Sequence, residues 1–128
     1  MITYTTDIGD ISMEKLNGFF VGWANPLTSE QHFNHLNKCA HFVAALDNGI
    51  VVGFISAISD GIGCAFISLI EVLPEYQNQG IGSELMLKML EMLQNMRAID
   101  LICDENVVGF YERFGMMKLT GMGIRRII

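Results

Sequence analysis

The sequence has few basic residues, and this shortage limits the partners that the protein can bind. Its 128 residues include 8 Lys and Arg against 14 Asp and Glu, giving a formal net charge of -6 and an isoelectric point near 4.8. Binding to nucleic-acid phosphates requires a broad excess of positive charge. Nucleic acid is therefore not expected as a partner. If the protein has a substrate besides an anionic one, its negative field favours a cation such as an amine.

Long hydrophobic runs are absent, and cysteine is scarce. Every apolar run is broken well before the ~20 residues of a membrane-spanning helix, and the first residues lack the basic start and apolar stretch of a signal peptide. Cys39, Cys64 and Cys103 are odd in number, widely spaced and set among apolar residues, so we expect reduced, buried thiols without disulfides. These absences predict a soluble cytoplasmic protein that contacts no membrane.

What the sequence does contain is enough apolar material for one core. With 51% hydrophobic and 17% charged residues, the chain predicts a single α/β (α+β) domain over residues 1–128. Hydrophobic periodicity and turn residues define the elements. Strands are expected at 2–6, 41–46, 50–58, 64–73, 98–103 and 116–128, and helices at about 10–20, 28–39, 82–96 and 107–114.

Two features indicate how these elements connect. Asn48-Gly49 supplies the positive φ angles of a tight turn and predicts a hairpin between the second and third strands. The near-continuous apolar run 64–73 predicts a central strand buried on both faces. From this run to Cys103 the order strand, helix, strand is typical of a βαβ crossover.

The segment Gln77-Asn78-Gln79-Gly80-Ile81-Gly82-Ser83 lies between that strand and an amphipathic helix. The first N–H groups of a helix have no internal partners and carry the positive end of its dipole. Gly80 and Gly82 let the backbone approach a bulky anion such as a pyrophosphate, although two glycines can also do no more than shape a turn.

The same segment resembles the cofactor motif of the GNAT superfamily of N-acyltransferases, which has Gln or Arg, two residues, Gly, one residue, and Gly or Ala. Upstream, residues 72–76 resemble the end of that family's fourth strand, and downstream Phe110-Tyr111-Glu112-Arg113-Phe114-Gly115 resembles its aromatic-Tyr-Glu-basic-x-Gly signature. The resemblance covers Ala40 to Leu119 well and the N-terminal third loosely.

The resemblance implies a mixed, mostly antiparallel sheet of about six strands, with helices on both faces and strands four and five splayed around acetyl-CoA, the cosubstrate. Pantetheine would bond to the backbone near Ile70 and Val72, and the pyrophosphate would lie on the N–H groups of residues 78–83. Asn78 and Gln79 stand where the family often has a basic residue, so the helix dipole and N–H groups must contribute more. Asp104 would either contact the pantetheine or end its strand.

Acylation of an amine requires a base for the amine, stabilisation of the oxyanion and a proton for the departing thiolate. Tyr111 resembles the family tyrosine that donates to the sulfur of coenzyme A. Glu71 lies in an apolar strand where burial would raise its pKa, and it is either the general base or a structural carboxylate. Ser68 could instead hold a water that relays the proton.

The remaining candidates concern the acceptor and metals. Phe20 and Trp23, with Phe19, either wall the acceptor pocket or pack helices onto the sheet. His32 and His35 share a helix face without a third ligand signal, so no metal is predicted. The prediction is an N-acetyltransferase that acetylates a primary amine of a small molecule by direct attack in a ternary complex. The alternatives are a protein or peptide N-acetyltransferase and a non-catalytic acyl-CoA-binding module. Homodimerisation stays open.

Overall fold

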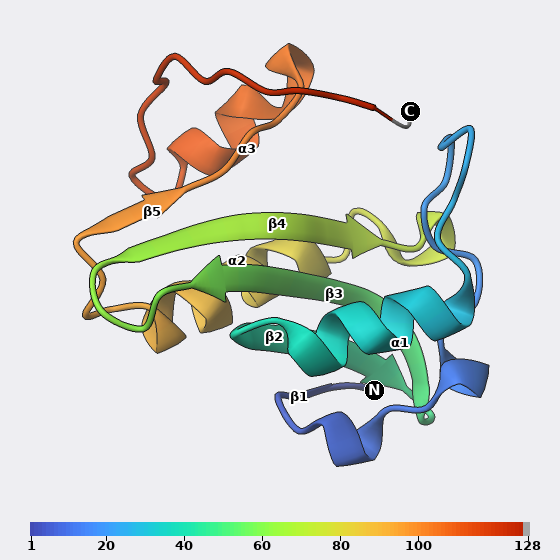
Figure 1. Ribbon diagram of the computed structural model, residues 1–128. Coiled ribbons are helices and arrows are strands. Elements are labelled where there is room, and N and C mark those ends of the chain that lie inside the picture. The colour runs from blue at the N-terminus through green and yellow to red at the C-terminus, as the bar shows by residue number, and fades with distance from the viewer. Residues whose placement is uncertain (127–128) are drawn as a thin grey trace.

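The computed structural model describes residues 1–126, and its central element is a five-stranded sheet in the order β1-β2-β3-β4-β5 (Figure 1). Strands β1 to β4 pair antiparallel with their neighbours, and β5 pairs parallel with β4. This mixed, mostly antiparallel sheet confirms the predicted class. The strands are β1 (Ile2–Thr5), β2 (His41–Asp47), β3 (Ile50–Ser59), β4 (Cys64–Val72) and β5 (Ala98–Asp100).

Two longer helices cover opposite faces of the sheet, and a short third helix follows β5 (Figure 1). They are α1 (Ser29–Lys38), α2 (Ile81–Met92) and α3 (Val108–Glu112). Short 3₁₀ helices lie at Ile8–Asp10 and Met13–Lys15 before α1, at Pro74–Tyr76 before α2 and at Glu105–Val107 before α3. The side chain of Thr28, which with Ser29 is one of the two cap candidates in the sequence, caps α1, because Gln31 N donates to Thr28 Oγ1 and Thr28 N donates to Gln31 Oε1. The parallel pair β4 and β5, joined through α2, is the predicted crossover.

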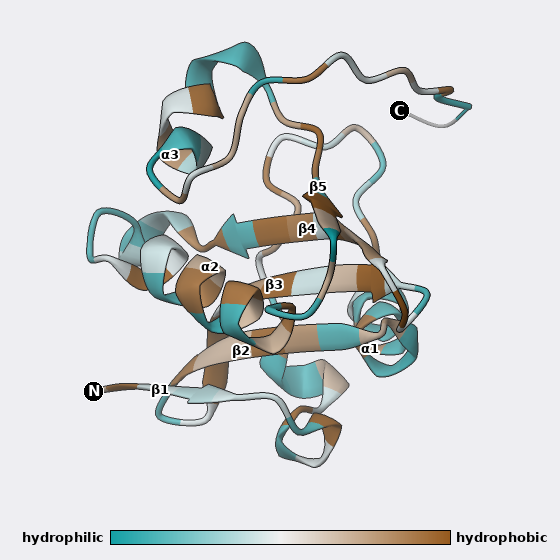
Figure 2. Cartoon of the chain, turned by 90° about the vertical axis from the view of Figure 1, so that its left-hand side faces the viewer, coloured by the Kyte–Doolittle hydropathy of each residue, from teal (hydrophilic) through white to brown (hydrophobic). Residues whose placement is uncertain are grey.

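The hairpin between β2 and β3 turns where the sequence predicts it. Asn48 and Gly49 have φ angles of 51° and 80°, as a two-residue turn with matching twist requires. The hairpin places β3 in the middle of the sheet. β3 is buried from Val51 to Ala57, and Figure 2 shows the hydrophobic colouring concentrated on the inner strands.

The prediction that β4 is buried on both faces is wrong. β4 pairs with β5 over only three residue pairs, from Cys64 with Ala98 to Phe66 with Asp100. Beyond them β5 turns away, and the second half of β4 is half-buried (Figure 1). The apolar run 64–73 therefore corresponds to a strand whose outer side is partly uncovered. The buried strand of the sheet is β3.

The segment after α3 differs from prediction as well. Residues 116–126 form no strand, and residues 127–128 of the expected sixth strand lie outside the described part of the chain. Gly121 and Gly123 interrupt the alternation of apolar residues, and the three residues of β5 offer only a short edge for pairing. The apolar side chains of this segment are largely exposed, as with Met122 at 94%.

The N-terminal helix expected at about 10–20 is replaced by two 3₁₀ helices, at Ile8–Asp10 and Met13–Lys15. Gly18 follows with a φ of 86°, which an α-helix cannot contain. The three cysteines are free, as predicted, but they are not buried thiols: Cys64 is exposed, and Cys39 and Cys103 are half-buried. Within residues 1–126, no helix combines the length and apolar character needed to cross a membrane.

An aromatic cluster joins α1 to the sheet around His32. The ring of His32 lies 4.3 Å from that of Phe54 and also contacts Phe19 and Phe20. His32 is 1% exposed, and neither ring nitrogen has a hydrogen-bond partner among residues 1–126. Burial, with a smaller contribution from His35, lowers the pKa of His32 to about 4.

The first prediction concerns the acid stability that this histidine limits. The unfolded chain takes up the proton near the ordinary pKa of about 6.5, whereas the folded chain takes it up only near pH 4. Protonation therefore favours the unfolded state as the pH falls from 7 to 4, by about 3 kcal/mol over that range. His32→Phe should remove this loss while keeping an aromatic ring in the cluster.

Urea unfolding at pH 7, 5.5 and 4 measures the effect on the wild type and on His32→Phe. His41→Gln is the matched control, because it removes a half-buried histidine outside the cluster and should keep the wild-type pH dependence. Parallel stability curves for the wild type and His32→Phe would contradict the assignment.

Candidate functional site

The segment from β4 to α2 folds as an anion-binding turn. Asn78 and Gly80 have φ angles of 64° and 83°, and Gly80 is the N-cap of α2 without a side-chain cap bond. Because no side chain caps the helix, the N–H groups of its first turn remain available to a ligand at the positive end of the dipole. Alternation of right- and left-handed residues is also typical of backbone nests that bind anions.

A guanidinium group lies beside this turn. Arg113 Nη2 donates to Ser83 Oγ at 2.6 Å, and the guanidinium carbon is 5.2 Å from the centroid of Phe110 and 5.7 Å from that of Phe114. The two rings hold the cation through cation-π contacts. Arg113 thus supplies, from α3, the positive charge that residues 78 and 79 lack. Sequence reasoning noted the residue in the C-terminal signature but assigned it no role.

Gly82 leaves room between α2, β4 and α3. A Cβ atom added to Gly82 would lie 3.7 Å from the ring of Phe110 and 3.9 Å from a methyl group of Val72. These are ordinary contacts, so packing alone does not require glycine at this position. The missing side chain instead keeps the space beside Ile81, Gly82 and Ser83 open.

The side-chain amides of the turn point back to the backbone. Gln77 Nε2 donates to the Val72 carbonyl at 3.0 Å, and Gln79 Nε2 donates to the Glu75 carbonyl at 3.4 Å. Both glutamines therefore stabilise the turn, and any contact they make with an anion would use their backbone N–H groups.

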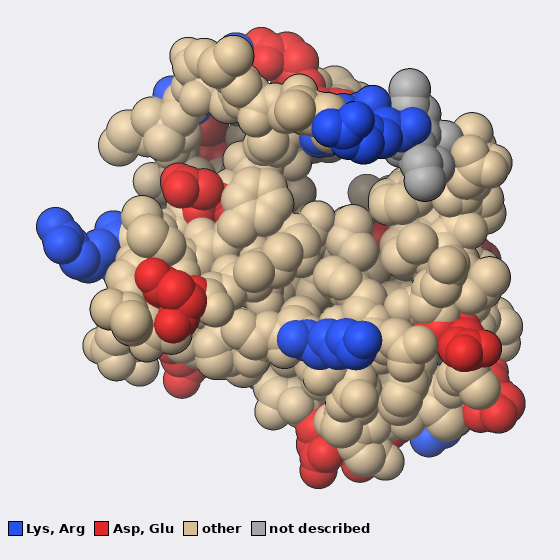
Figure 3. Space-filling view, viewed as in Figure 1, with Lys and Arg blue, Asp and Glu red and all other residues tan. Residues whose placement is uncertain are grey.

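The edge of β4 that faces β5 is open next to this turn. No strand pairs with that edge from Ile67 onward within residues 1–126, and Ile70 and Val72 are both half-buried. Figure 3 shows open space between the body of the sheet and the chain that passes above it after β5. Asp104 belongs to the segment that follows β5; it is exposed, and its carbonyl accepts from Val107 N at the start of a 3₁₀ helix.

Tyr111 lies on α3, on the same side of the opening as Asp104. It is half-buried, and its ring is 5.0 Å from that of Phe110. Burial raises the pKa of the Tyr111 hydroxyl, and Cys103 raises it further. The phenol therefore keeps its proton at neutral pH and can act as a donor.

Glu71 anchors the aromatic loop of residues 17–25 to β4. Phe20 N–H donates to both carboxylate oxygens, at 2.8 and 2.9 Å, and Val21 N–H donates to Oε2 at 3.3 Å. Phe20 has a φ of 64°, an unfavourable conformation for an aromatic residue that these bonds help to hold. One of the two roles considered for Glu71 was a structural one, and the hydrogen bonds from Phe20 and Val21 are its physical basis.

The two aromatic candidates of this loop differ in exposure. Phe20 is 4% exposed and packs in the His32 cluster, so its ring is core and does not wall a pocket. Trp23 contacts Phe20 at 4.9 Å between ring centroids but is 47% exposed. Trp23 is thus the exposed aromatic side chain of this loop.

Ser68 belongs to a second polar group on the α1 side of the sheet. Its Oγ lies 2.9 Å from Ser56 Oγ, which in turn lies 2.7 Å from His35 Nε2. Ser68 comes where the β3–β4 register shifts, between the pairs Ser56 with Leu69 and Ala57 with Ile67. The shift turns Ser68 toward Ser56, and a strict alternation of strand residues does not predict this.

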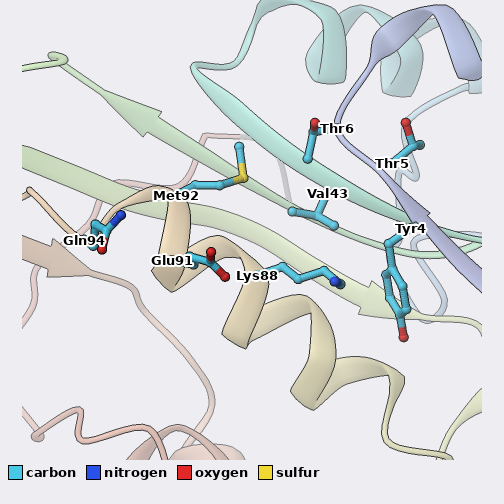
Figure 4. A pocket seen from close by; sticks show the side chains of 8 residues that line it. All are labelled: Tyr4, Thr5, Thr6, Val43, Lys88, Glu91, Met92 and Gln94. Carbon is cyan, nitrogen blue, oxygen red and sulfur yellow. The ribbon is translucent and has the colours of Figure 1, made fainter.

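Two surface hollows lie away from all these groups. One, of about 410 Å³, is formed by β1 and α2 and includes Tyr4, Val43 and Lys88 (Figure 4). The other, of about 460 Å³, includes Ile8, Leu36 and Phe42. Neither contains a predicted site residue, and the part of the chain that the structure describes holds no group of three potential metal ligands.

Comparison with known proteins identifies the family of this chain. The Acetyltransferase (GNAT) family matches residues 11–116, and the chain belongs to this family of acyl-CoA-dependent N-acetyltransferases. A search of curated proteins gives no match.

Several solved structures are similar to the chain. A candidate acetyltransferase of Deinococcus radiodurans R1 is 42% identical, with a TM-score of 0.94, covering 98% of this chain and 88% of that one. A GNAT family acetyltransferase of Streptococcus pneumoniae TIGR4 is 34% identical, with a TM-score of 0.79, covering 98% and 99%. Glucosamine-6-phosphate N-acetyltransferase of Arabidopsis thaliana, at 14% identity and a TM-score of 0.74 over 98% and 97%, shares the fold.

The second prediction tests Glu71 as the anchor of the loop. In Glu71→Gln one carboxylate oxygen becomes an NH2 group, which cannot accept from Phe20 N–H. Loss of a charge-assisted bond should lower the free energy of unfolding by about 1–3 kcal/mol. Hydrogen exchange at the amides of Phe20 and Val21 should also accelerate.

Glu75→Gln is the control, because that exposed carboxylate forms no hydrogen bond with the loop. Wild-type stability and wild-type protection of both amides in Glu71→Gln would exclude the anchoring role.

Proposed function

We propose that the protein transfers the acetyl group of acetyl-CoA to a primary amine of a small molecule, by direct attack in a ternary complex. One observation carries the proposal: Arg113 fixes a cation on the uncapped first turn of α2, beside the open edge of β4. A ligand with a pyrophosphate at one end and amides along its length matches these two features. Family membership and the five-stranded GNAT-like sheet support the same reading.

Different residues of the chain would bind different parts of the cofactor. The N–H groups of residues 78–83 and the guanidinium of Arg113 would hold the pyrophosphate, and the β4 backbone at Ile70 and Val72 would bind the pantetheine amides. Gln77 would act by stabilising the turn, and Asp104 by shaping the opposite side of the opening. Bound acetyl-CoA supplies the activated thioester.

Tyr111 supports the second half of the reaction. The thiolate that leaves when the C–N bond forms needs a proton, and the phenol of Tyr111 stays protonated at neutral pH. Tyr111 follows Phe110 on α3, and the ring of Phe110 lies beside Gly82; this supports a role for Tyr111 on the side where the cofactor is proposed to bind.

The acceptor would enter from the α1 side of β4. The net charge of -6 favours a cationic amine, and the side chains proposed to meet it are the exposed Trp23 and the half-buried Ser68. Glu71 is proposed in the first place as the anchor of the acceptor loop. We expect the reaction to take place in the cytoplasm, in a monomer or a homodimer.

The test combines binding and turnover on the purified protein. Calorimetric titration with acetyl-CoA should give saturable binding, and a panel of small primary amines should release thiol above the hydrolysis blank. Turnover only with peptides or protein N-termini would replace the small-molecule acceptor. Binding without turnover on any amine would leave an acyl-CoA-binding module, and absence of binding would refute the cofactor site.

The third prediction concerns the proton donor. Tyr111→Phe keeps the ring and its contact with Phe110 but removes the hydroxyl. The turnover number should fall about a hundredfold, whereas affinity for acetyl-CoA should change little. Tyr76→Phe is a suitable control, since its hydroxyl bonds to Asp47 away from the opening. Wild-type turnover in Tyr111→Phe would leave Tyr111 as a packing residue.

The fourth prediction concerns the phosphate site. Arg113→Gln removes one fixed cation and should weaken acetyl-CoA binding about tenfold, as the loss of one charge-assisted bond implies. The difference from wild type should shrink at high salt because the lost contact is electrostatic. Arg97→Gln changes the net charge equally at an exposed position after α2 and is the control. Equal affinities of both variants would rule out a local contact.

A further inference from the structure

A chain of three polar side chains runs from β4 through β3 to α1. Ser68 Oγ and Ser56 Oγ are 2.9 Å apart, and Ser56 Oγ and His35 Nε2 are 2.7 Å apart. Ser56 is completely buried, whereas Ser68 and His35 at the two ends are half-buried. The chain is therefore a continuous hydrogen-bonded path through the core with both ends near the surface.

The inventory of donors permits a path directed toward His35, with Ser68 Oγ also within 3.4 Å of the Ser56 carbonyl as a second acceptor. Each serine has one O–H donor, and a neutral histidine has one protonated ring nitrogen. If His35 carries its proton on Nδ1, Nε2 accepts from Ser56, and Ser56 Oγ is free to accept from Ser68. A lone pair of Ser68 Oγ then remains free to receive a proton.

We propose that Ser68, Ser56 and His35 form a relay that carries the proton of the attacking amine to solvent. This inference rests on the proposed acetyl transfer. As the C–N bond forms and the C–S bond breaks, the amine N–H proton passes to Ser68 Oγ. The proton of Ser68 moves to Ser56 Oγ, and that of Ser56 moves to His35 Nε2. The imidazolium releases its Nδ1 proton to solvent, which leaves the remaining ring proton on Nε2. Before the next turnover the ring exchanges this Nε2 proton for one on Nδ1 through solvent, and both hydroxyls rotate back.

The surroundings of His35 suit a proton acceptor of this kind. Burial lowers its pKa, so the ring is neutral at physiological pH. The groups that face it are His32 from its own helix, Ser56 from β3 and, behind Ser56, Ser68 from β4. No salt bridge to His35 is formed by any residue between 1 and 126, so no carboxylate holds it in the charged form.

Glu71 is less suited to the same task. Its two oxygens already accept from Phe20 and Val21, and taking a proton would weaken the bonds that hold the loop. The relay separates the two duties, because Glu71 positions the acceptor loop while the serines and His35 move the proton.

The kinetic test uses His35→Gln and Ser56→Ala. Glutamine can keep a hydrogen bond to Ser56 but cannot take up a proton, so turnover should fall about a hundredfold and the acidic limb of the pH-rate profile should disappear. Ser56→Ala should reduce turnover similarly, because it breaks the path. Affinity for acetyl-CoA should remain that of the wild type in both. His41→Gln, a histidine change on β2 outside the path, should keep the limb.

A spectroscopic measurement tests the direction of the path without turnover. Long-range ¹H–¹⁵N correlation spectra at pH 7.5 should show the His35 proton on Nδ1, and Ser56→Ala should shift the Nε2 resonance. A proton on Nε2 would overturn the relay, because Ser56 could not then donate to His35. An unchanged acidic limb in an active His35→Gln protein would overturn it too, while the proposed function stands. A wild type that acetylates no amine would remove the proposed function itself, and the relay with it.

Discussion

The short pairing between β4 and β5 is the constraint on which the rest of the site depends. Only three residue pairs join the two strands, so the N–H and C=O groups along the outer edge of β4 from Ile67 to Val72 have no strand partner within the described chain. Backbone polar groups need partners, and a ligand rich in amides can supply them. The crossover starts the next helix at Ile81, soon after β4 ends, so the open edge and the uncapped helix start are neighbours by connectivity.

In the proposed function, strand β4 also separates the two substrates. Glu71 pairs with Phe54 and contacts the loop on the α1 side, whereas Val72 lies beside Gly82 and Phe110 on the α2 side. Alternation along one strand thus assigns successive residues to opposite sides of the sheet. The register shift at Ser68 adds a further residue to the α1 side. The proposed acceptor side and the proposed cofactor side therefore lie on opposite faces of the same strand, separated by the thickness of its backbone.

Features encoded locally could be predicted from the sequence, and features that depend on distant contacts could not. The Asn48-Gly49 turn, the Thr28 cap and the glycine-led start of α2 each follow from a few adjacent residues. The anchoring of Phe20 by Glu71 joins residues 51 positions apart. Arg113 reaches Ser83 only because α3 folds back over α2. Apolar composition likewise could not show that β5 leaves β4, so the burial of β4 was overestimated.

An acidic protein that binds an anion must rely on short-range contacts. The net charge of -6 repels a polyphosphate at a distance and attracts an amine. At the start of α2 the helix dipole and one guanidinium act within a few ångströms, where salt screens them less than it screens the long-range field. Phe110 and Phe114 hold Arg113 in place before any ligand arrives, so little side-chain freedom remains to be lost on binding. Moderate salt should therefore weaken the overall repulsion of the cofactor more than it weakens the contact with Arg113.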